Sequence, residues 1–120
     1  MKKILILEDD PDAAMSMKLL AESGGYSADI SLDYREAISK MKKYDLLLLD
    51  LILMPEMTGR KVLDLMGKLG IETPVIVVSA VALRRTVAEE ISQSHPEVGF
   101  VSKTDMHTDL LPAIRKKIEK

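Results

Sequence analysis

Three short apolar runs constrain the fold of this 120-residue chain more than any other feature of its sequence. Ile4–Leu7, Leu46–Leu49 and Val75–Val78 contain no polar residue. A run of strand length without polar alternation is typical of a parallel strand that is buried on both faces of a sheet. Ser27–Ser31 and Val98–Val101 are less apolar and suit the edges of the same sheet. We therefore expect a five-stranded sheet with the three apolar runs at its centre.

Amphipathic stretches separate the expected strands, and their ends carry helix signals. Asp10 can cap a helix with Pro11 in its first position, and Gly24 and Gly25 can end it. The same reasoning predicts four more helices, which start at Asp33, span Thr58–Leu69 and Leu83–Gln93, and start again at Thr108 or Asp109. The side chains expected to face the sheet in the third helix are Val62, Leu65, Met66 and Leu69. Pro112 is expected in or near the first turn of the last helix, where proline is tolerated.

Strands and helices therefore alternate along the whole chain, which indicates an α/β protein built from βα units. Right-handed crossovers then give a doubly wound sandwich, with helices on both faces of a parallel five-stranded sheet. The economical arrangement is the flavodoxin-like (βα)5 fold with strand order 2-1-3-4-5. We expect residues 1–120 to form one domain of ordinary size.

Composition and charge exclude several classes of protein. The formal net charge of −2 gives no overall basic character for binding nucleic acid, and no apolar run approaches the ~18 residues of a membrane span. The chain has no cysteine, which excludes disulfides and thiolate catalysis. The apolar run after MKK is shorter than the ~7–15 residues that a signal peptide needs. We expect a cytoplasmic protein that binds no membrane and, through this domain, no nucleic acid directly.

Polar side chains follow four of the expected strands where each strand ends. Glu8 and Asp9 follow the first strand, Asp50 the third, Ser79 the fourth and Lys103 the fifth. In doubly wound folds, ligands bind beyond the carboxyl ends of the strands, at the point where the strand order reverses. That point lies between the first and third strands here. The topology therefore brings three carboxylates, a hydroxyl and an ammonium to one rim.

The chemistry of these groups favours phosphoryl transfer. Two carboxylates about 4 Å apart repel by roughly 4 kcal/mol at an effective dielectric of 20, so three together take up protons or recruit a cation. An oxygen cluster with open positions suits Mg²⁺ or Mn²⁺, which keep waters and accept a phosphate oxygen as a ligand. Taken singly, each residue also has an ordinary explanation as a solvated strand end, a turn cap or a surface lysine. Their coincidence at one rim carries the functional interpretation.

Four stretches in order give the chain a family resemblance: ILILEDDPD, YDLLLLDLILMPEMTG, PVIVVSA and GFVSK. With these, it resembles the CheY-like receiver domain of bacterial two-component response regulators over essentially its whole length. The resemblance implies that Asp50 is the phosphoacceptor and that Glu8 and Asp9 are the acidic pair that holds Mg²⁺ with it. It also implies a metal contact from the backbone carbonyl of Ile52, two residues after the acceptor.

The same resemblance implies roles in switching and in partner recognition. Ser79 would hydrogen-bond the phosphoryl oxygen, Lys103 would pair with it, and Phe100 falls where the family keeps its switch aromatic. The partners implied are a sensor histidine kinase or phosphotransfer protein and a downstream output domain or protein. A homodimer would form through the fourth helix, fifth strand and fifth helix, whose surface phosphorylation remodels.

Two positions depart from the family pattern. Receivers usually place proline four residues after the phosphoacceptor, whereas Pro55 follows Asp50 by five. We expect a local bulge after Ile52 that keeps the metal site, with Leu53 as the alternative source of the carbonyl. The family also usually has proline, often in cis, directly after its lysine. Thr104 stands there instead, and we expect a trans bond because a non-proline cis bond costs about 2.5–4 kcal/mol.

Two rival functions follow from the same residues. The first is a pseudo-receiver that has the fold but acts as a protein-binding module without phosphorylation. The second is a Mg²⁺-dependent phosphohydrolase, but such enzymes usually place a second aspartate two residues after the nucleophile, where this chain has Ile52. No G-x-x-x-x-G-K-[ST] or G-x-G-x-x-G motif is present, which argues against nucleotide binding. We expect a signalling phosphoacceptor that catalyses only its own phosphorylation and dephosphorylation, and is otherwise no enzyme.

Overall fold

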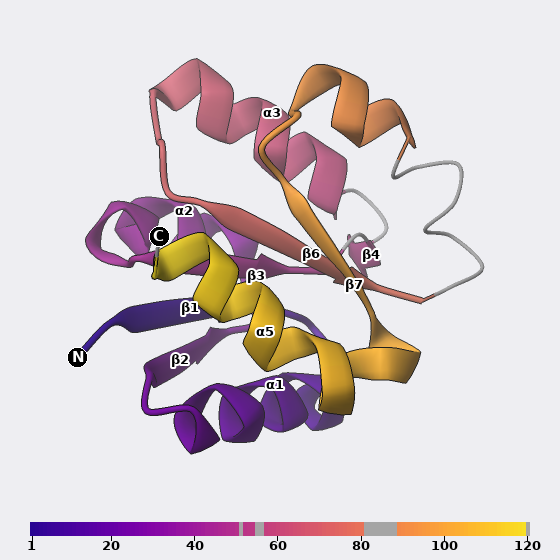
Figure 1. The fold of residues 1–120 in the computed structure, drawn as a ribbon. Helices are drawn as coiled ribbons and strands as arrows, with labels where there is room; N and C mark the ends of the chain where they lie inside the picture. The colour runs from indigo at the N-terminus through magenta and orange to yellow at the C-terminus, as the bar shows by residue number, and fades with distance from the viewer. Residues whose placement is uncertain (51, 55–56, 81–88, 120) are drawn as a thin grey trace.

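A five-stranded parallel sheet forms the centre of the molecule. The computed structural model describes residues 1–50, 52–54, 57–80 and 89–119. The sheet consists of β1 (Lys3–Leu7), β2 (Ser27–Ser31), β3 (Leu46–Leu49), β6 (Val75–Ser79) and β7 (Gly99–Ser102). Its strand order is β2-β1-β3-β6-β7, with every neighbouring pair parallel (Figure 1). In chain order this is 2-1-3-4-5, so the predicted flavodoxin-like fold is confirmed.

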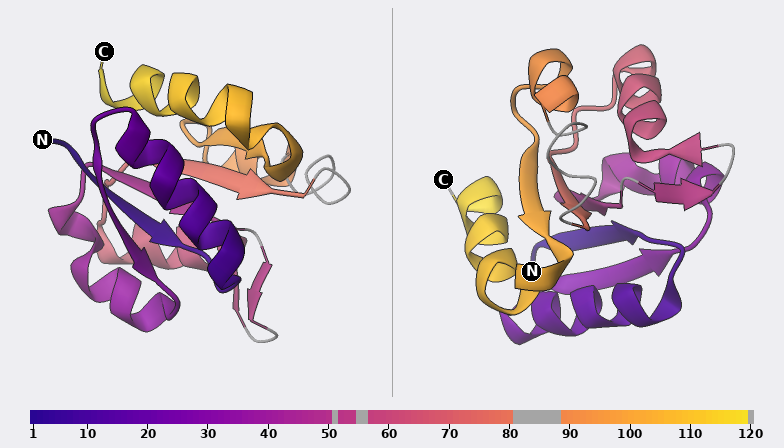
Figure 2. Two further views of the ribbon diagram at one scale, coloured as in Figure 1. Left: turned by 90° about the horizontal axis from the view of Figure 1, so that it is seen from below. Right: turned by 90° about the vertical axis from the view of Figure 1, so that its right-hand side faces the viewer.

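Helices cover both faces of this sheet. The α-helices are α1 (Pro11–Ser23), α2 (Tyr34–Lys40), α3 (Gly59–Leu69) and α5 (Met106–Ile118), and residues 89–94 are also helical. Short 3₁₀ turns span Met41–Lys43 and Lys103–Asp105. α1 and α5 lie on one side of the sheet, and α2, α3 and residues 89–94 lie on the other (Figure 2). The N-terminal part of the helix predicted at 83–93 lies outside the described residues.

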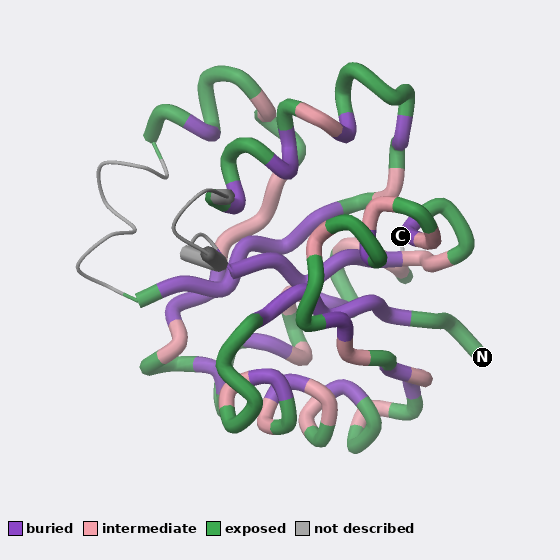
Figure 3. Tube along the Cα trace, turned by 180° about the vertical axis from the view of Figure 1, so that it is seen from behind, coloured by how far each residue is buried: buried purple, intermediate pink, exposed green. Residues whose placement is uncertain are grey.

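Alternate residues of each strand feed two separate apolar cores. In β1, Ile4 and Ile6 pack into the core beneath α1 and α5, whereas Leu5 and Leu7 pack into the core beneath α2 and α3. β3 follows the same alternation, and all four of its leucines are fully buried. Figure 3 shows purple, buried strands at the centre, whereas the helices around them alternate between buried and exposed residues. The continuous apolar runs are thus explained by burial on both faces.

The predicted helix ends are largely confirmed by the cap geometry. Asp10 accepts a hydrogen bond from the Asp12 backbone N–H at the start of α1, with Pro11 as the first helical residue. Thr58 accepts one from the Lys61 N–H at the start of α3. α3 ends at Gly70, whose φ of 70° lies in the left-handed region that glycine adopts without strain.

Two helical details differ from the sequence prediction. In α3, Leu63 is buried instead of Leu69, which lies in the last turn before the chain reverses and is 50% exposed. α5 starts at Met106, earlier than predicted, because Met106 packs into the core and extends the buried stripe that continues through Leu110 and Ile114. Pro112 consequently lies inside the helix and not in its first turn.

One further antiparallel pair follows β3. It consists of β4 (Ile52–Met54) and β5 (Met57–Thr58), in which Ile52 pairs with Thr58 and Met54 with Met57. Two steps on β4 therefore face one step on β5, which is a bulge centred between Ile52 and Met54. The bulge predicted after Ile52 is thus present. Within the described ranges, no helix combines the length and the apolar character needed to cross a membrane.

Candidate functional site

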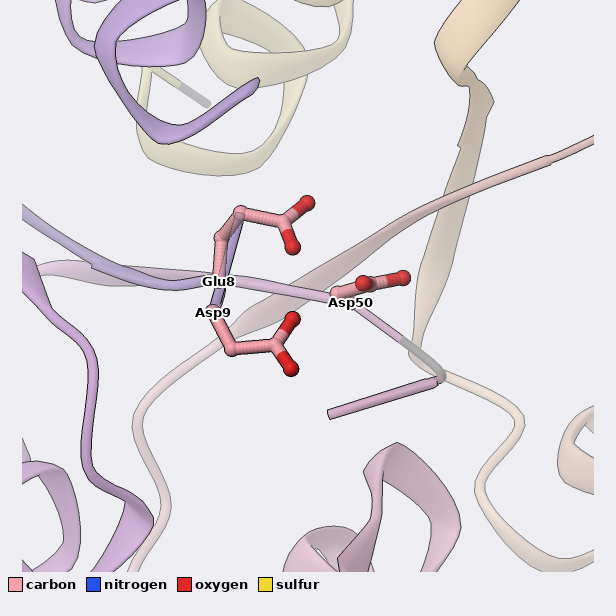
Figure 4. A group of neighbouring side chains, drawn as sticks. All are labelled: Glu8, Asp9 and Asp50. Carbon is pink, nitrogen blue, oxygen red and sulfur yellow. The ribbon is translucent and has the colours of Figure 1, made fainter. Parts of the chain in front are cut away.

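Three carboxylates converge beyond the carboxyl ends of β1 and β3. Glu8, Asp9 and Asp50 each offer an oxygen, and these oxygens lie within 4.8 Å of one another. Their side chains turn toward the same region, as Figure 4 shows. Glu8 and Asp50 are buried, whereas Asp9 is exposed. The group has the all-oxygen composition and the open side that suit a hard divalent cation such as Mg²⁺.

The parallel pairing of β1 with β3 brings these side chains together. Leu7 is in register with Leu49, so the residues that follow each strand emerge next to each other. The Asp50 backbone N–H also donates to the Leu7 carbonyl oxygen at 3.1 Å, which extends the pairing past the strand end. The Asp10 N–H donates to Glu8 Oε2 at 3.2 Å as α1 begins. These bonds therefore hold the backbone of Asp50 and the carboxylate of Glu8 in place.

Lys103 brings a positive charge to the two buried carboxylates. Its Nζ lies 2.8 Å from Glu8 Oε1 and 3.3 Å from Asp50 Oδ2. The contact with Asp50 has hydrogen-bond geometry, and the shorter contact with Glu8 is a close ion pair. Because Lys103 reaches the site from the loop after β7, it links the far edge of the sheet to its centre.

The pKa shifts follow from burial and crowding. Burial raises the pKa of Glu8, and the nearby Asp50 adds to this effect while Lys103 partly offsets it. Partial burial and the Glu8 carboxylate raise the pKa of Asp9. Burial alone would lower the pKa of Lys103, but Glu8 and Asp50 outweigh it and the net shift is upward. Crowding of negative charge thus raises the pKa of both carboxyls, and a cation at this rim would offset the same repulsion.

Ser79 places a hydroxyl at the same rim. It is the last residue of β6 and is only 1% exposed. Its Oγ has no hydrogen-bond partner among the described residues, although a buried hydroxyl without a partner is costly. The Ser79 hydroxyl therefore has a hydrogen bond to offer to a ligand at this rim.

Phe100, the predicted switch aromatic, is half-buried on β7 and packs against the α2–α3 core.

The loop after Lys103 has the predicted trans backbone. No peptide bond among the described residues is cis. Lys103 to Asp105 form a 3₁₀ turn that leads directly into α5, and Ser102 caps this turn. Sequence reasoning missed Ser102, whose only sequence signal is its place directly before Lys103.

A separate hollow lies at the opposite end of β6. It has a volume of about 530 Å³ and is lined by residues that include Met66, Val75 and His95. None of the predicted site residues lines it. The charged rim and this hollow are therefore different places, because a metal and a phosphoryl group need converging charges more than an enclosed cavity.

The family assignment rests on a match across nearly the whole chain. Residues 4–115 match the family model described as the response regulator receiver domain. The chain belongs to this family. The five site residues that carried the resemblance, from Glu8 to Lys103, all fall within the matched range of this receiver.

Curated relatives of this receiver are transcriptional and cell-cycle regulators. It is 34% identical over 80 residues to the transcriptional regulatory protein DltR of Streptococcus agalactiae, a match that covers 65% of this chain and 35% of that protein. It is 32% identical over 83 residues to the cell cycle response regulator CtrA of Brucella ovis, covering 67% of this chain and 35% of that protein. The match thus spans about a third of the length of each of these relatives.

Solved structures of receivers superpose closely on this chain. The signal receiver domain of a LuxO repressor protein from Vibrio parahaemolyticus has a TM-score of 0.85 at 27% identity, covering 98% of this chain and 90% of that one. The response regulator TrrA of Thermotoga maritima, solved in complex with Mg²⁺–BeF, has a TM-score of 0.77 at 26% identity, covering 98% and 99% of the two chains. The receiver fold is therefore shared over almost the full length of this chain.

Proposed function

We propose that this receiver is a phosphoacceptor that takes a phosphoryl group onto Asp50 from a sensor histidine kinase or a phosphotransfer protein. One observation carries the proposal: two buried carboxylates, an exposed third and a lysine ammonium meet at one rim. The neighbouring strand β6 ends there with the buried Ser79 hydroxyl, which has no hydrogen-bond partner among the described residues. A phosphoryl group on Asp50 would give the Ser79 hydroxyl an acceptor and the Lys103 ammonium an anion.

The residues at the rim also fit a divalent cation. Glu8, Asp9 and Asp50 would hold Mg²⁺ or Mn²⁺, with a backbone carbonyl from Ile52 or, because of the bulge, from Leu53. When bound, the cation supplies positive charge that neutralises the phosphoryl oxygens during transfer. The solved complex of TrrA with Mg²⁺–BeF supports the same pairing of a cation with this kind of site.

The transfer itself balances with groups on this chain. A carboxylate oxygen of Asp50 attacks the phosphorus of a phosphohistidine, the P–N bond breaks, and its electron pair stays on the imidazole nitrogen, which takes a proton. Lys103 donates to the oxygens of the arriving group during transfer, and Ser79 donates to them once the group is in place, so charge on these oxygens meets donors of the protein. The reaction modifies the protein itself, and in this proposal the receiver turns over no external substrate beyond its own phosphorylation and dephosphorylation.

The phosphorylated state would be read by other surfaces. Ser79 moving onto the phosphoryl group, with Phe100 turning inward, would shift the surface formed by residues 89–94, β7 and α5. An output domain or a separate output protein would read this surface, and two copies could pair through it as a homodimer. One such output is gene regulation, as in the transcriptional regulatory protein DltR, to which this chain is similar. A sensor kinase uses ATP, which is available in the cytoplasm, so we expect this function there.

Mass spectrometry of the intact protein tests the proposal. The receiver is incubated with acetyl phosphate and Mg²⁺ and then weighed. We expect one added phosphoryl group, which is absent in Asp50→Asn and absent when a chelator removes the metal. Asp45→Asn is the matched control, because Asp45 caps the start of β1 through the Lys3 N–H, away from the rim.

Each other outcome supports a different function. No adduct on the wild-type protein, with the fold intact, would overturn the proposal in favour of a protein-binding pseudo-receiver. Continuous release of phosphate from many phosphate esters would point instead to a hydrolase. An adduct that persists in Asp50→Asn would show that another residue is the acceptor.

A further inference from the structure

The Ser102 hydroxyl caps the turn that carries Lys103. A receiver with the usual proline after its lysine lacks the backbone N–H that this cap needs. The Thr104 backbone N–H donates to Ser102 Oγ at 3.2 Å, which makes Ser102 the cap of the 3₁₀ turn Lys103–Asp105. Ser102 is only 1% exposed, whereas Thr104 is exposed, so the bond is partly buried. Proline has no N–H, and the bond exists because Thr104 occupies that position.

This capping bond spans Lys103. Its donor and its acceptor lie on the residues directly after and directly before the lysine, so it fixes the backbone from which the lysine side chain departs. Asp105, the next residue in a capping position, makes no side-chain capping bond at the start of α5. The Ser102 hydroxyl therefore supplies the side-chain cap that orders the segment between β7 and α5.

The sheet places this cap next to the rest of the site. Ser102 is in register with Ser79 in the parallel pair of β6 and β7, and paired residues of parallel strands face the same side of a sheet. The ammonium of Lys103 reaches back to Glu8 and Asp50 at the centre of the sheet. A shift in the turn would move that ammonium, because the long lysine side chain amplifies any change in its backbone direction.

We propose that Ser102 is a positioning residue for phosphoryl transfer, which acts by capping the Lys103–Thr104 turn and thereby aims the Lys103 ammonium at the acceptor site. The inference rests on the proposed function for its effect on phosphorylation. The geometric part, the aim of Lys103, stands independently of it.

Phosphorylation kinetics with acetyl phosphate and Mg²⁺ test the functional part. Ser102→Ala removes the acceptor, and we expect about a fivefold lower rate, which corresponds to about 1 kcal/mol and to the usual worth of one cap. Ser102→Thr keeps a hydroxyl and is expected to restore most of the rate. Ser92→Ala changes an exposed serine of the helix 89–94 and is the control for a serine lost elsewhere.

A double-mutant cycle separates positioning from general damage. If Ser102 acts through Lys103, adding Ser102→Ala to Lys103→Ala causes no further loss of rate. A fivefold loss that persists in the Lys103→Ala background would overturn the inference, since the serine would then act by another route. An unchanged rate for Ser102→Ala alone would overturn it as well.

Lysine NMR keeps the inference testable even if the chain takes up no phosphoryl group. In protein labelled with ¹³C-lysine, the Lys103 Cε signal is assigned by its loss in Lys103→Arg. We expect Ser102→Ala to move this signal toward those of exposed lysines and Ser102→Thr to leave it in place. A Lys103 signal that Ser102→Ala does not move would sink the geometric claim, whereas a missing phosphoryl adduct in the wild-type protein would sink only the proposed function.

Discussion

Replacing Lys103 by methionine tests how the metal-free protein tolerates its buried carboxylates. At an effective dielectric of about 20, the ammonium attracts Glu8 at 2.8 Å by roughly 6 kcal/mol and Asp50 at 3.3 Å by roughly 5 kcal/mol, before the cost of removing water from the charges. Losing one partner of a buried ion pair costs about 3–5 kcal/mol net. Because 29% of the Lys103 side chain is exposed, we expect the lower end, about 3 kcal/mol off the free energy of unfolding.

Urea unfolding with and without Mg²⁺ measures this effect. At a Mg²⁺ concentration about ten times the dissociation constant, a cation that binds only the folded state adds roughly 1.4 kcal/mol. We expect a larger gain in Lys103→Met than in the wild-type protein, because the cation then meets no competing ammonium. Lys42→Met, at an exposed lysine of the 3₁₀ turn after α2, should change stability by less than about 0.5 kcal/mol. Equal midpoints for Lys103→Met and wild type without metal would refute the reasoning.

Other predictions concern the scaffold. Burial and the hydrogen bond to Asp29 raise the pKa of Tyr44 to about 12. The neutral phenol therefore stabilises the folded state. This stabilisation is complete below the ordinary pKa of 10.0 and is lost as the pH rises through about 12. An absorbance titration of the tyrosines should show this late step, and Tyr44→Phe should remove it. Gly67→Ala, in an open interior position of α3, should stabilise by about 0.5–1 kcal/mol, whereas Gly70→Ala, at a φ of 70°, should destabilise by about 1–2 kcal/mol. Met17→Ala should lower the free energy of unfolding by about 2–5 kcal/mol because the Met17 side chain is fully buried. Urea midpoints that reverse the order of the two glycine variants, or that are unchanged in Met17→Ala, would contradict the packing described here.

The sheet was predictable from the sequence because burial on both faces leaves a direct trace in residue type. Leu46–Leu49 had no polar residue, and each of its side chains lies in one of the two cores. The functional rim was predictable for a related reason: parallel strands end at one edge, so residues directly after them converge. Knowing where β1 and β3 end was enough to bring Glu8 and Asp50 together.

Other features depend on three-dimensional context that local patterns do not carry. Leu69 belongs to the apolar stripe of α3 by periodicity, but it lies where the helix ends, and half of it is exposed. The early start of α5 depends on the space that Met106 fills in the core. Glu8 and Asp9 are adjacent carboxylates in the sequence, yet only Glu8 is buried. The cap formed by Ser102 required the trans turn at Lys103 to be known first.

Chemical trapping of the phosphorylated residue tests the central claim most directly. The wild-type protein is treated with acetyl phosphate and Mg²⁺, reduced with borohydride, which converts an aspartyl phosphate to homoserine, and digested for peptide sequencing by mass spectrometry. We predict homoserine at position 50 and an unmodified aspartate at positions 9 and 10. Homoserine at another aspartate, or at none of them in protein that is folded and loaded with Mg²⁺, would contradict the account.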